Sequence, residues 1–164
     1  MRVLVTGSSG EIGKAIASKL SSEGWEVISP PRESLELGDR SSISLFMKEL
    51  ISDGALDALV LNAGVNDPTP VLSQGFSAAV EKSLAVNLLA NNQIVQATAG
   101  ILSRSNQGSI VAVSSLYGNR ARAGRASYSQ SKAALEAFIR TLSVELAPSG
   151  IRSNSVAPGF IETA

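Results

Sequence analysis

The stretch TGSSGEIG at residues 6–13 decides the fold of this chain. It follows the apolar run MRVLV and precedes KAIASKL, whose apolar residues recur with the spacing of an amphipathic helix. A strand, a glycine-rich turn and a helix in this order can bind the pyrophosphate of a dinucleotide on backbone N–H groups at the start of the helix. The glycines at positions 7, 10 and 13 can fill the roles that such a loop requires. We therefore predict a dinucleotide-binding loop.

The same glycines allow two other interpretations of this loop. The glycines can serve only to reverse the chain after a strand, or they can belong to a phosphate-transferring P-loop. The P-loop is disfavoured because its lysine precedes Ser or Thr, whereas Lys14 is followed by Ala15. Glu11 stands where an anion would approach, and a carboxylate facing phosphates would oppose binding. We expect Glu11 to lie in the first helical turn and to point to solvent.

The rest of the chain alternates between strand and helix patterns. Further apolar runs rich in β-branched residues are WEVIS (25–29), ALDALVLN (55–62), GSIVAVSS (108–115) and IRSNSVA (151–157). Helical periodicity covers residues 11–23, 41–52, 77–104 and 128–147. Parallel strands need crossovers, and runs this apolar need cover on both faces, so we predict one parallel sheet with helices on each side. The segment PPRESLELGD (30–39) predicts a turn and a brief strand near Leu35–Leu37.

Length and composition limit the function classes. The 164 residues, without a linker or repeat, predict a single domain over residues 1–164. The 14 basic and 14 acidic residues balance, which argues against a nucleic-acid partner. There is no signal peptide or membrane span, so a cytoplasmic protein without a membrane partner is expected. The chain contains no cysteine and no histidine, so no metal site is expected and acid–base chemistry must use Tyr, Lys, Asp or Glu.

Three residues in the C-terminal half are candidates for such chemistry. Tyr128 and Lys132 in YSQSK are four residues apart, so a helix presents both on the same face. An ammonium beside a phenol stabilises the phenolate, which brings the tyrosine proton within reach of neutral-pH chemistry. Ser115 ends the strand GSIVAVSS, where parallel sheets bind ligands, and its hydroxyl can bond a carbonyl oxygen. Taken alone, the pair can also be an ordinary helix surface with an extended lysine.

These residues resemble the short-chain dehydrogenase/reductase family, and the resemblance covers the whole chain. It rests on TGSSGEIG (6–13), LNAG (61–64), Asn87 within AVNLLA, GSIVAVSS (108–115), YSQSK (128–132) and NSVAPGFIET (154–163). Within the family the chain is most similar to 3-oxoacyl-carrier-protein reductases. The resemblance implies a Rossmann-type doubly wound sheet, a nicotinamide cofactor and a small carbonyl or alcohol substrate, and it suggests a 3-oxoacyl thioester or a related ketone. It also implies a homodimer or homotetramer formed through the helices near residues 77–104 and 128–147.

The resemblance assigns a role to each matching residue. Tyr128 would be the acid in ketone reduction and the base in alcohol oxidation, and Lys132 would stabilise its phenolate and bind the nicotinamide ribose. Ser115 would polarise the carbonyl, and Asn87 would hold a water that links Lys132 to solvent. The implied cofactor-binding residues, besides Tyr128 and Lys132, are Gly7, Ser9, Gly10, Ile12, Gly13, Arg32, Glu36, Leu37, Asn62, Ala63, Gly64, Pro158, Gly159, Ile161 and Thr163.

The choice of nicotinamide depends on the residues after the second strand. An acid there would bond the ribose 2′-hydroxyl and select NAD(H), but the sequence reads ISPPRES and offers Arg32 to a 2′-phosphate. We therefore expect NADP(H), with NAD(H) as the alternative. Relatives of this type usually carry TGxxxGxG, often with a basic residue where this chain has Gly10. Arg32 must then set the cofactor preference alone.

The chain departs from the family at its end. Relatives of this type usually continue beyond PGFIET into a helical substrate cover and a final strand. We expect residues 1–164 to be a C-terminally incomplete domain, and the predicted sheet lacks that last strand. A second hypothesis is therefore a non-catalytic module that binds or senses a dinucleotide. The presence together of Asn87, Ser115, Tyr128 and Lys132 favours the enzyme, because binding needs only some of them.

Overall fold

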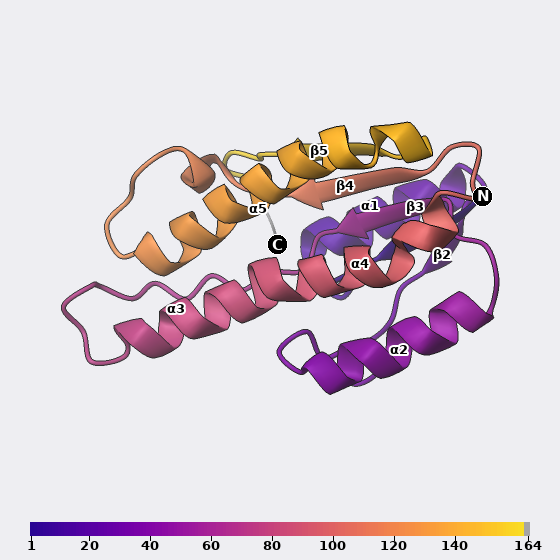
Figure 1. The fold of residues 1–164 in the computed structure, drawn as a ribbon. Coiled ribbons are helices and arrows are strands. Elements are labelled where there is room, and N and C mark those ends of the chain that lie inside the picture. Colours follow the sequence, from indigo (N-terminus) through magenta and orange to yellow (C-terminus); the bar gives the residue numbers. More distant parts are fainter. Residues whose placement is uncertain (163–164) are drawn as a thin grey trace.

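A parallel sheet of five strands forms the centre of the structure, a computed structural model that describes residues 1–162 (Figure 1). The strands are β1 (Arg2–Val5), β2 (Glu26–Ile28), β3 (Ala58–Leu61), β4 (Ser109–Val113) and β5 (Arg152–Val156). Their spatial order is β2-β1-β3-β4-β5, and each neighbouring pair is parallel. The predicted parallel sheet is confirmed, and each of these strands lies inside the apolar run that predicted it.

Helices cover both faces of the sheet, as predicted. They are α1 (Glu11–Ser22), α2 (Arg40–Ser52), α3 (Phe76–Leu84), α4 (Ala90–Leu102) and α5 (Ala126–Glu145), with a π-helical segment η1 (Ala85–Leu89) and two 3₁₀ turns, η2 (Leu116–Gly118) and η3 (Ala147–Ser149). In Figure 1, α1 lies behind the sheet, and α4 and α5 lie in front of it. Among the helices within residues 1–162, none is long and apolar enough to cross a membrane.

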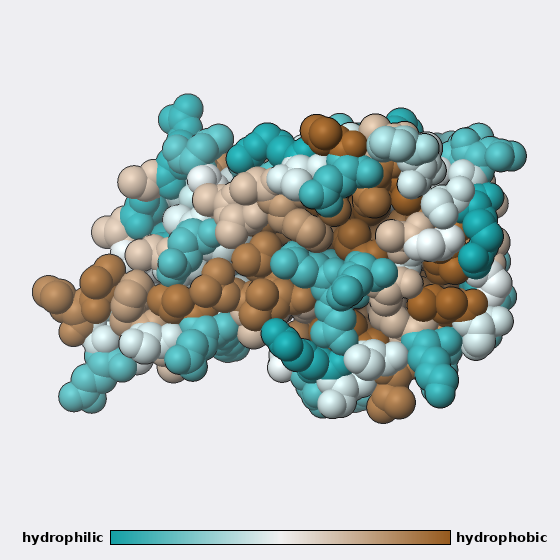
Figure 2. All heavy atoms as spheres, viewed as in Figure 1, coloured by the Kyte–Doolittle hydropathy of each residue, from teal (hydrophilic) through white to brown (hydrophobic). Residues whose placement is uncertain are grey.

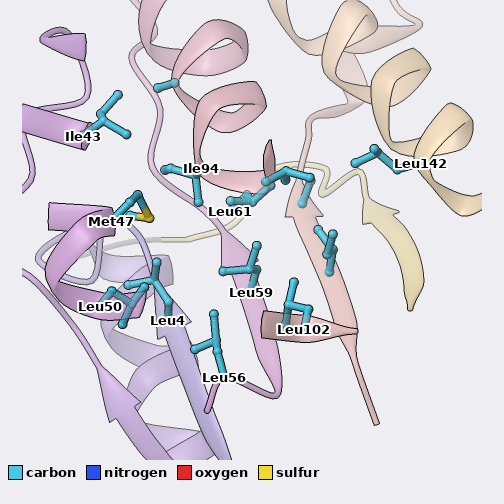
Figure 3. Close-up of a cluster of buried hydrophobic side chains, with 14 of the residues drawn as sticks. Leu4, Ile43, Met47, Leu50, Leu56, Leu59, Leu61, Ile94, Leu102 and Leu142 are labelled. Carbon is cyan, nitrogen blue, oxygen red and sulfur yellow. The ribbon is translucent and has the colours of Figure 1, made fainter. Parts of the chain in front are cut away.

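The larger part of the core lies between the sheet and helices α2, α4 and α5 (Figure 3). Ile43 of α2 and Ile94 of α4 belong to this cluster together with Leu59 of β3, and Leu59 and Ile94 have no exposed surface. On the opposite face, Val5 of β1 belongs to a smaller cluster against which Ile16 of α1 packs. Burying one such aliphatic side chain stabilises the fold by roughly 1.5–3 kcal/mol. The two clusters hold α1 and α5 against the sheet edge where the site forms.

The brief strand predicted near Leu35–Leu37 is wrong, because this segment forms turns. The N–H group of Leu35 donates to the carbonyl of Pro31 at 3.2 Å, and that of Asp39 donates to the carbonyl of Glu36 at 3.0 Å. These local bonds use backbone donors that a strand would give to its neighbour. Leu35 and Leu37 are nevertheless buried, since both pack into the larger core. The alternation of leucine with a polar residue at positions 35–37 therefore reflects burial of the two leucines and not a strand.

The loops after β1 and β3 meet at the carboxyl edge of the sheet. The chain leaves β1 for β2 on one side and later crosses back to β3 on the other side. In open α/β sheets, connections that run in opposite directions from adjacent strands leave a crevice between them, and ligands bind there. The glycine loop at residues 6–13 therefore begins at one side of this crevice, and Asn62 begins the other side.

Candidate active site

The glycine loop packs so closely that side chains cannot replace two of its glycines. Gly7 has a φ of +67°, and a Cβ on it would lie 2.7 Å from the Cα of Ala63. A Cβ on Gly13 would lie 2.2 Å from the carbonyl oxygen of Gly7 and 2.6 Å from Nδ2 of Asn62. Gly10 meets no such obstacle but is the N-cap of α1, so no side chain caps the first helical N–H groups. These N–H groups are available to an anion.

Thr6 and Asn62 fasten the glycine loop to the loop after β3. Oγ1 of Thr6 accepts hydrogen bonds from the backbone N–H groups of Asn62 at 3.0 Å and Ala63 at 3.1 Å. In return, Nδ2 of Asn62 donates to the carbonyls of Thr6 at 3.0 Å and Gly7 at 3.1 Å. Asn62 directly follows β3, so its side chain stands at the carboxyl end of that strand. The role of Thr6 was not predicted from the sequence.

A groove of about 530 Å³ runs from the glycine loop to the turns after β2. The predicted residues that line it are Gly7, Ser9, Gly10, Ile12, Gly13, Arg32, Glu36, Leu37, Asn62, Ala63 and Gly64. Additional lining residues that the sequence did not single out include Pro30, Val65, Lys82 and Val86. Glu11 is exposed in the first turn of α1, as expected, although it also borders the groove.

Arg32 and Glu36 form an ion pair at the far end of this groove. Nε of Arg32 donates to one carboxylate oxygen of Glu36, and the N–H group of Gly38 donates to the other at 3.1 Å. The bond from Arg32, followed by that from Gly38, holds the pKa of Glu36 below its ordinary value. The Arg32 side chain is largely exposed and so remains accessible to a ligand, but Glu36 competes for it.

A second pocket, of about 280 Å³, adjoins the groove. Both cavities are lined by Ile12, Asn62 and Gly64, so they form one continuous depression. The predicted residues that line only the second pocket are Ser115, Tyr128, Lys132, Pro158, Gly159 and Ile161. Thr163, also predicted to bind the cofactor, lies outside the described residues. Ser114 and Asn66 line this pocket as well and were not predicted.

Lys132 is buried beneath Tyr128 on α5. Only 3% of Lys132 is exposed, and its Nζ lies 5.7 Å from the centre of the Tyr128 ring. Nζ donates to the carbonyl of Val113, at the end of β4, over 2.7 Å. Burial disfavours the charged form and lowers the pKa of Lys132 from 10.5 to about 8. The ammonium form therefore dominates below about pH 8, next to the phenol.

Ser115 lies where β4 ends and faces the same pocket. Its Oγ accepts a hydrogen bond from the N–H group of Tyr117 at 3.2 Å, so Ser115 caps the short turn η2. Only 9% of the residue is exposed. A hydroxyl that accepts this bond can still donate its own hydrogen to a carbonyl oxygen in the pocket.

Asn87 lies behind the pocket and is fully buried in the π-helical segment η1. Its Oδ1 accepts from the N–H group of Val65 at 2.8 Å, and its Nδ2 donates to the Val65 carbonyl and to Oγ of Ser131. Nδ2 of Asn91 donates to the backbone carbonyl of Asn87 at 2.9 Å. The sequence predicted one uninterrupted helix here, so the π-helical turn and the contact with Asn91 were missed.

The residues present fit a nicotinamide dinucleotide. The N-terminus of α1 is open to a pyrophosphate, and the loop glycines leave space that a Cβ would close. From there the depression extends one way to Arg32 and the other way to Ser115, Tyr128 and Lys132. A dinucleotide lying along it would place its adenosine near Arg32 and its nicotinamide near Tyr128.

Known proteins share this sequence pattern and this fold. A family model described as short chain dehydrogenase matches residues 34–164. The chain is 30% identical to the uncharacterised oxidoreductase YmfI of Bacillus subtilis, over 98% of this chain and 74% of that protein. It is 35% identical to the 3-oxoacyl-[acyl-carrier-protein] reductase FabG of Aquifex aeolicus, over 98% of this chain and 64% of that protein, so it spans less than two thirds of the reductase. The crystal structure of a short chain dehydrogenase/reductase from Brucella ovis matches with a TM-score of 0.88 and 29% identity, covering 99% of this chain and 84% of that one.

Proposed function

The chain belongs to the short-chain dehydrogenase family, a family of oxidoreductase enzymes, and we propose that it reduces a ketone to a secondary alcohol, or catalyses the reverse reaction, with NADP(H). The observation that carries this proposal is the position of Ser115, Tyr128 and Lys132 around one pocket that adjoins the groove beside the glycine loop. A module that only binds a nucleotide would not need a hydroxyl, a phenol and a buried amine at the end of that groove.

Each of the three residues has a step in the proposed reaction. When bound, the nicotinamide supplies the hydride to the carbonyl carbon in reduction and accepts it in oxidation. Ser115 holds the carbonyl oxygen, and Tyr128 gives its phenolic proton to that oxygen as the C=O π electrons move onto it. The Lys132 ammonium stabilises the phenolate that remains. In alcohol oxidation the same phenolate takes the proton back.

Asn87 is proposed to support the return of a proton to Tyr128. A Cβ on Gly64 would meet Oδ1 of Asn87 at 3.1 Å and Nζ of Lys132 at 3.4 Å, so both side chains border the same backbone. The two hydrogen bonds between Asn87 and Val65, one donated by each residue, fix this loop beside Lys132. A water held at this π-helical turn would link Lys132 to solvent, as the family resemblance implies.

The proposed substrate is a 3-oxoacyl thioester or a related ketone. The similarity to a relative named 3-oxoacyl-[acyl-carrier-protein] reductase supports this class. The pocket of about 280 Å³ admits the reacting end of such a molecule, with Ser115 and Tyr128 as its polar groups. The test is to follow the loss of NADPH absorbance with a panel of 3-oxoacyl thioesters and other ketones. Turnover of one of them supports the proposal, whereas firm NADPH binding without any turnover favours the non-catalytic module.

Replacing Arg32 with alanine should weaken NADPH binding roughly tenfold and change NADH binding little, because a 2′-phosphate would lose a charge-assisted hydrogen bond. The competition from Glu36 keeps the expected loss at the lower end of the range for such bonds. Dissociation constants for both nucleotides, measured by fluorescence titration, check this. Arg104→Ala is the control, since Arg104 is exposed and does not line the groove. Equal losses for NADPH and NADH would exclude the 2′-phosphate contact.

We also propose that the chain forms a homo-oligomer through the apolar surface along α3 and η1. Figure 2 shows apolar residues gathered over α3 and the loop before it. Leu72 in this loop is fully exposed, and Leu89 of η1 is 43% exposed. Contiguous apolar surface of this kind marks interaction sites in folded proteins.

Leu89→Glu should lower the molar mass measured by light scattering toward that of the monomer, because a buried unpaired charge opposes association. Leu45→Glu on α2 is the control, since Leu45 is 66% exposed on a different helix. An oligomer that survives Leu89→Glu would place the interface elsewhere.

A further inference from the structure

One row of side chains on α5 contains a residue beyond those assigned to the reaction. Tyr128, Lys132 and Glu136 follow one another at intervals of four residues, so they lie along one face of the helix. Lys132 donates to the carbonyl of Val113 at 2.7 Å. Glu136 accepts, through Oε1, a hydrogen bond from Oγ of Ser114 at 2.7 Å. The two residues that precede Ser115 are therefore both bound by α5, one helical turn apart.

The carboxylate of Glu136 lies between α5 and the turn that follows Ser115. A Cβ on Gly118 would approach Oε1 of Glu136 to 2.8 Å, so a side chain at position 118 would push the carboxylate away from its place beside Ser114. The turn depends on Ser115, whose backbone carbonyl accepts from the N–H group of Gly118 at 2.8 Å. The Glu136 side chain is 16% exposed, and its other oxygen lies 4.0 Å from the guanidinium of Arg140.

We propose that Glu136 is a positioning residue, which holds Ser114 and η2 and thereby sets where the Ser115 hydroxyl stands relative to Tyr128. This inference rests on the proposed function, in which Ser115 and Tyr128 act on the same carbonyl oxygen. For this role Glu136 needs only an oxygen that accepts the hydrogen bond from the Ser114 hydroxyl. If the acceptor is lost, Ser114 can turn to the carbonyl of Lys132, which lies 3.5 Å from its Oγ, and the strand end shifts.

The first test compares variants of Glu136. Glu136→Ala should lower kcat for ketone reduction on the order of tenfold, because the reacting groups lose alignment, while NADPH affinity stays the same. Glu136→Gln keeps an acceptor for Ser114 and should restore kcat to within about twofold of the wild type. Glu145→Ala is the control, since Glu145 is an exposed carboxylate on the same helix.

The second test uses pairs of variants. Ser114→Ala should cost as much kcat as Glu136→Ala, and the double variant should cost no more than either, since both remove one interaction. Gly118→Ala should lower kcat in the wild type but not in the Glu136→Ala background, where the obstructing carboxylate is gone. If Gly118→Ala does not fold, the comparison of the single and double variants of Ser114 and Glu136 tests the proposal without it.

The outcomes separate this inference from the function on which it rests. A wild type that turns over ketones and a Glu136→Ala variant with unchanged kcat would overturn the inference and leave the proposed function standing. Additive losses for Ser114→Ala and Glu136→Ala would also overturn it. A wild type that binds NADPH but reduces no ketone would overturn the proposed function and this role of Glu136 with it.

Discussion

Replacing Tyr128 with phenylalanine should lower kcat for ketone reduction by a factor of about 10²–10⁴, because the substitution removes the only proton donor proposed for the carbonyl oxygen. The aromatic ring that borders the pocket remains, so NADPH affinity should stay within about twofold of the wild type. Steady-state kinetics with a turned-over ketone, together with a nucleotide titration, checks both expectations.

The chain supplies a matched control for this experiment. Tyr117 is the other of its two tyrosines, its hydroxyl accepts a hydrogen bond from Arg122 at 2.6 Å, and it does not line the pocket that contains Lys132. Tyr117→Phe should therefore retain kcat. A Tyr128→Phe variant as active as Tyr117→Phe would show that Tyr128 is not the proton donor.

Replacing Lys132 with methionine should lower kcat by about 10² or more and change how stability depends on pH. Burial lowers the pKa of Lys132 to about 8 in the folded protein, against 10.5 for the free side chain. Between these values the unfolded chain binds more protons than the folded one, so the wild type gains stability as pH rises from about 8 to 10.5. The shift corresponds to about 3 kcal/mol, and Lys132→Met should lack this gain. Urea unfolding across that pH range measures it.

Lys48→Met is the control for the pH experiment, because Lys48 is exposed on α2. It should retain both kcat and the rise in stability with pH. If the stability of Lys132→Met rises with pH as much as that of the wild type, groups other than Lys132 cause the rise. The buried Lys132 ammonium would then not lower the stability of the folded protein.

The strands and the catalytic candidates were predictable because their signals are local. Apolar runs such as GSIVAVSS mark strands that are covered on both faces, and a spacing of four on a helix brings Lys132 beside Tyr128 without any distant contact. The strand predicted near Leu35–Leu37 is wrong because that prediction, too, relied on a local signal alone. Its alternation reflects burial against the core, whereas local turn bonds decide its backbone.

The residues that support the site were not predictable, since contacts between distant segments create them. Thr6 joins the loops after β1 and β3, which are more than fifty residues apart. Glu136 reaches Ser114 only once α5 lies on the end of β4. The π-helical turn at Asn87 has no periodicity signal of its own, because one extra residue in a helical turn leaves the neighbouring pattern helical.

Isotope transfer tests the central claim most directly, since it follows the hydride itself. The wild type is mixed with a ketone that it turns over and NADPH that carries deuterium at the transferable position of the nicotinamide, and the alcohol is examined by mass spectrometry. Hydride transfer in the pocket formed by Ser115, Tyr128 and Lys132 predicts one deuterium on the carbinol carbon, and far less labelled alcohol from Tyr128→Phe. Alcohol without deuterium, or equal labelled product from Tyr128→Phe, would contradict it.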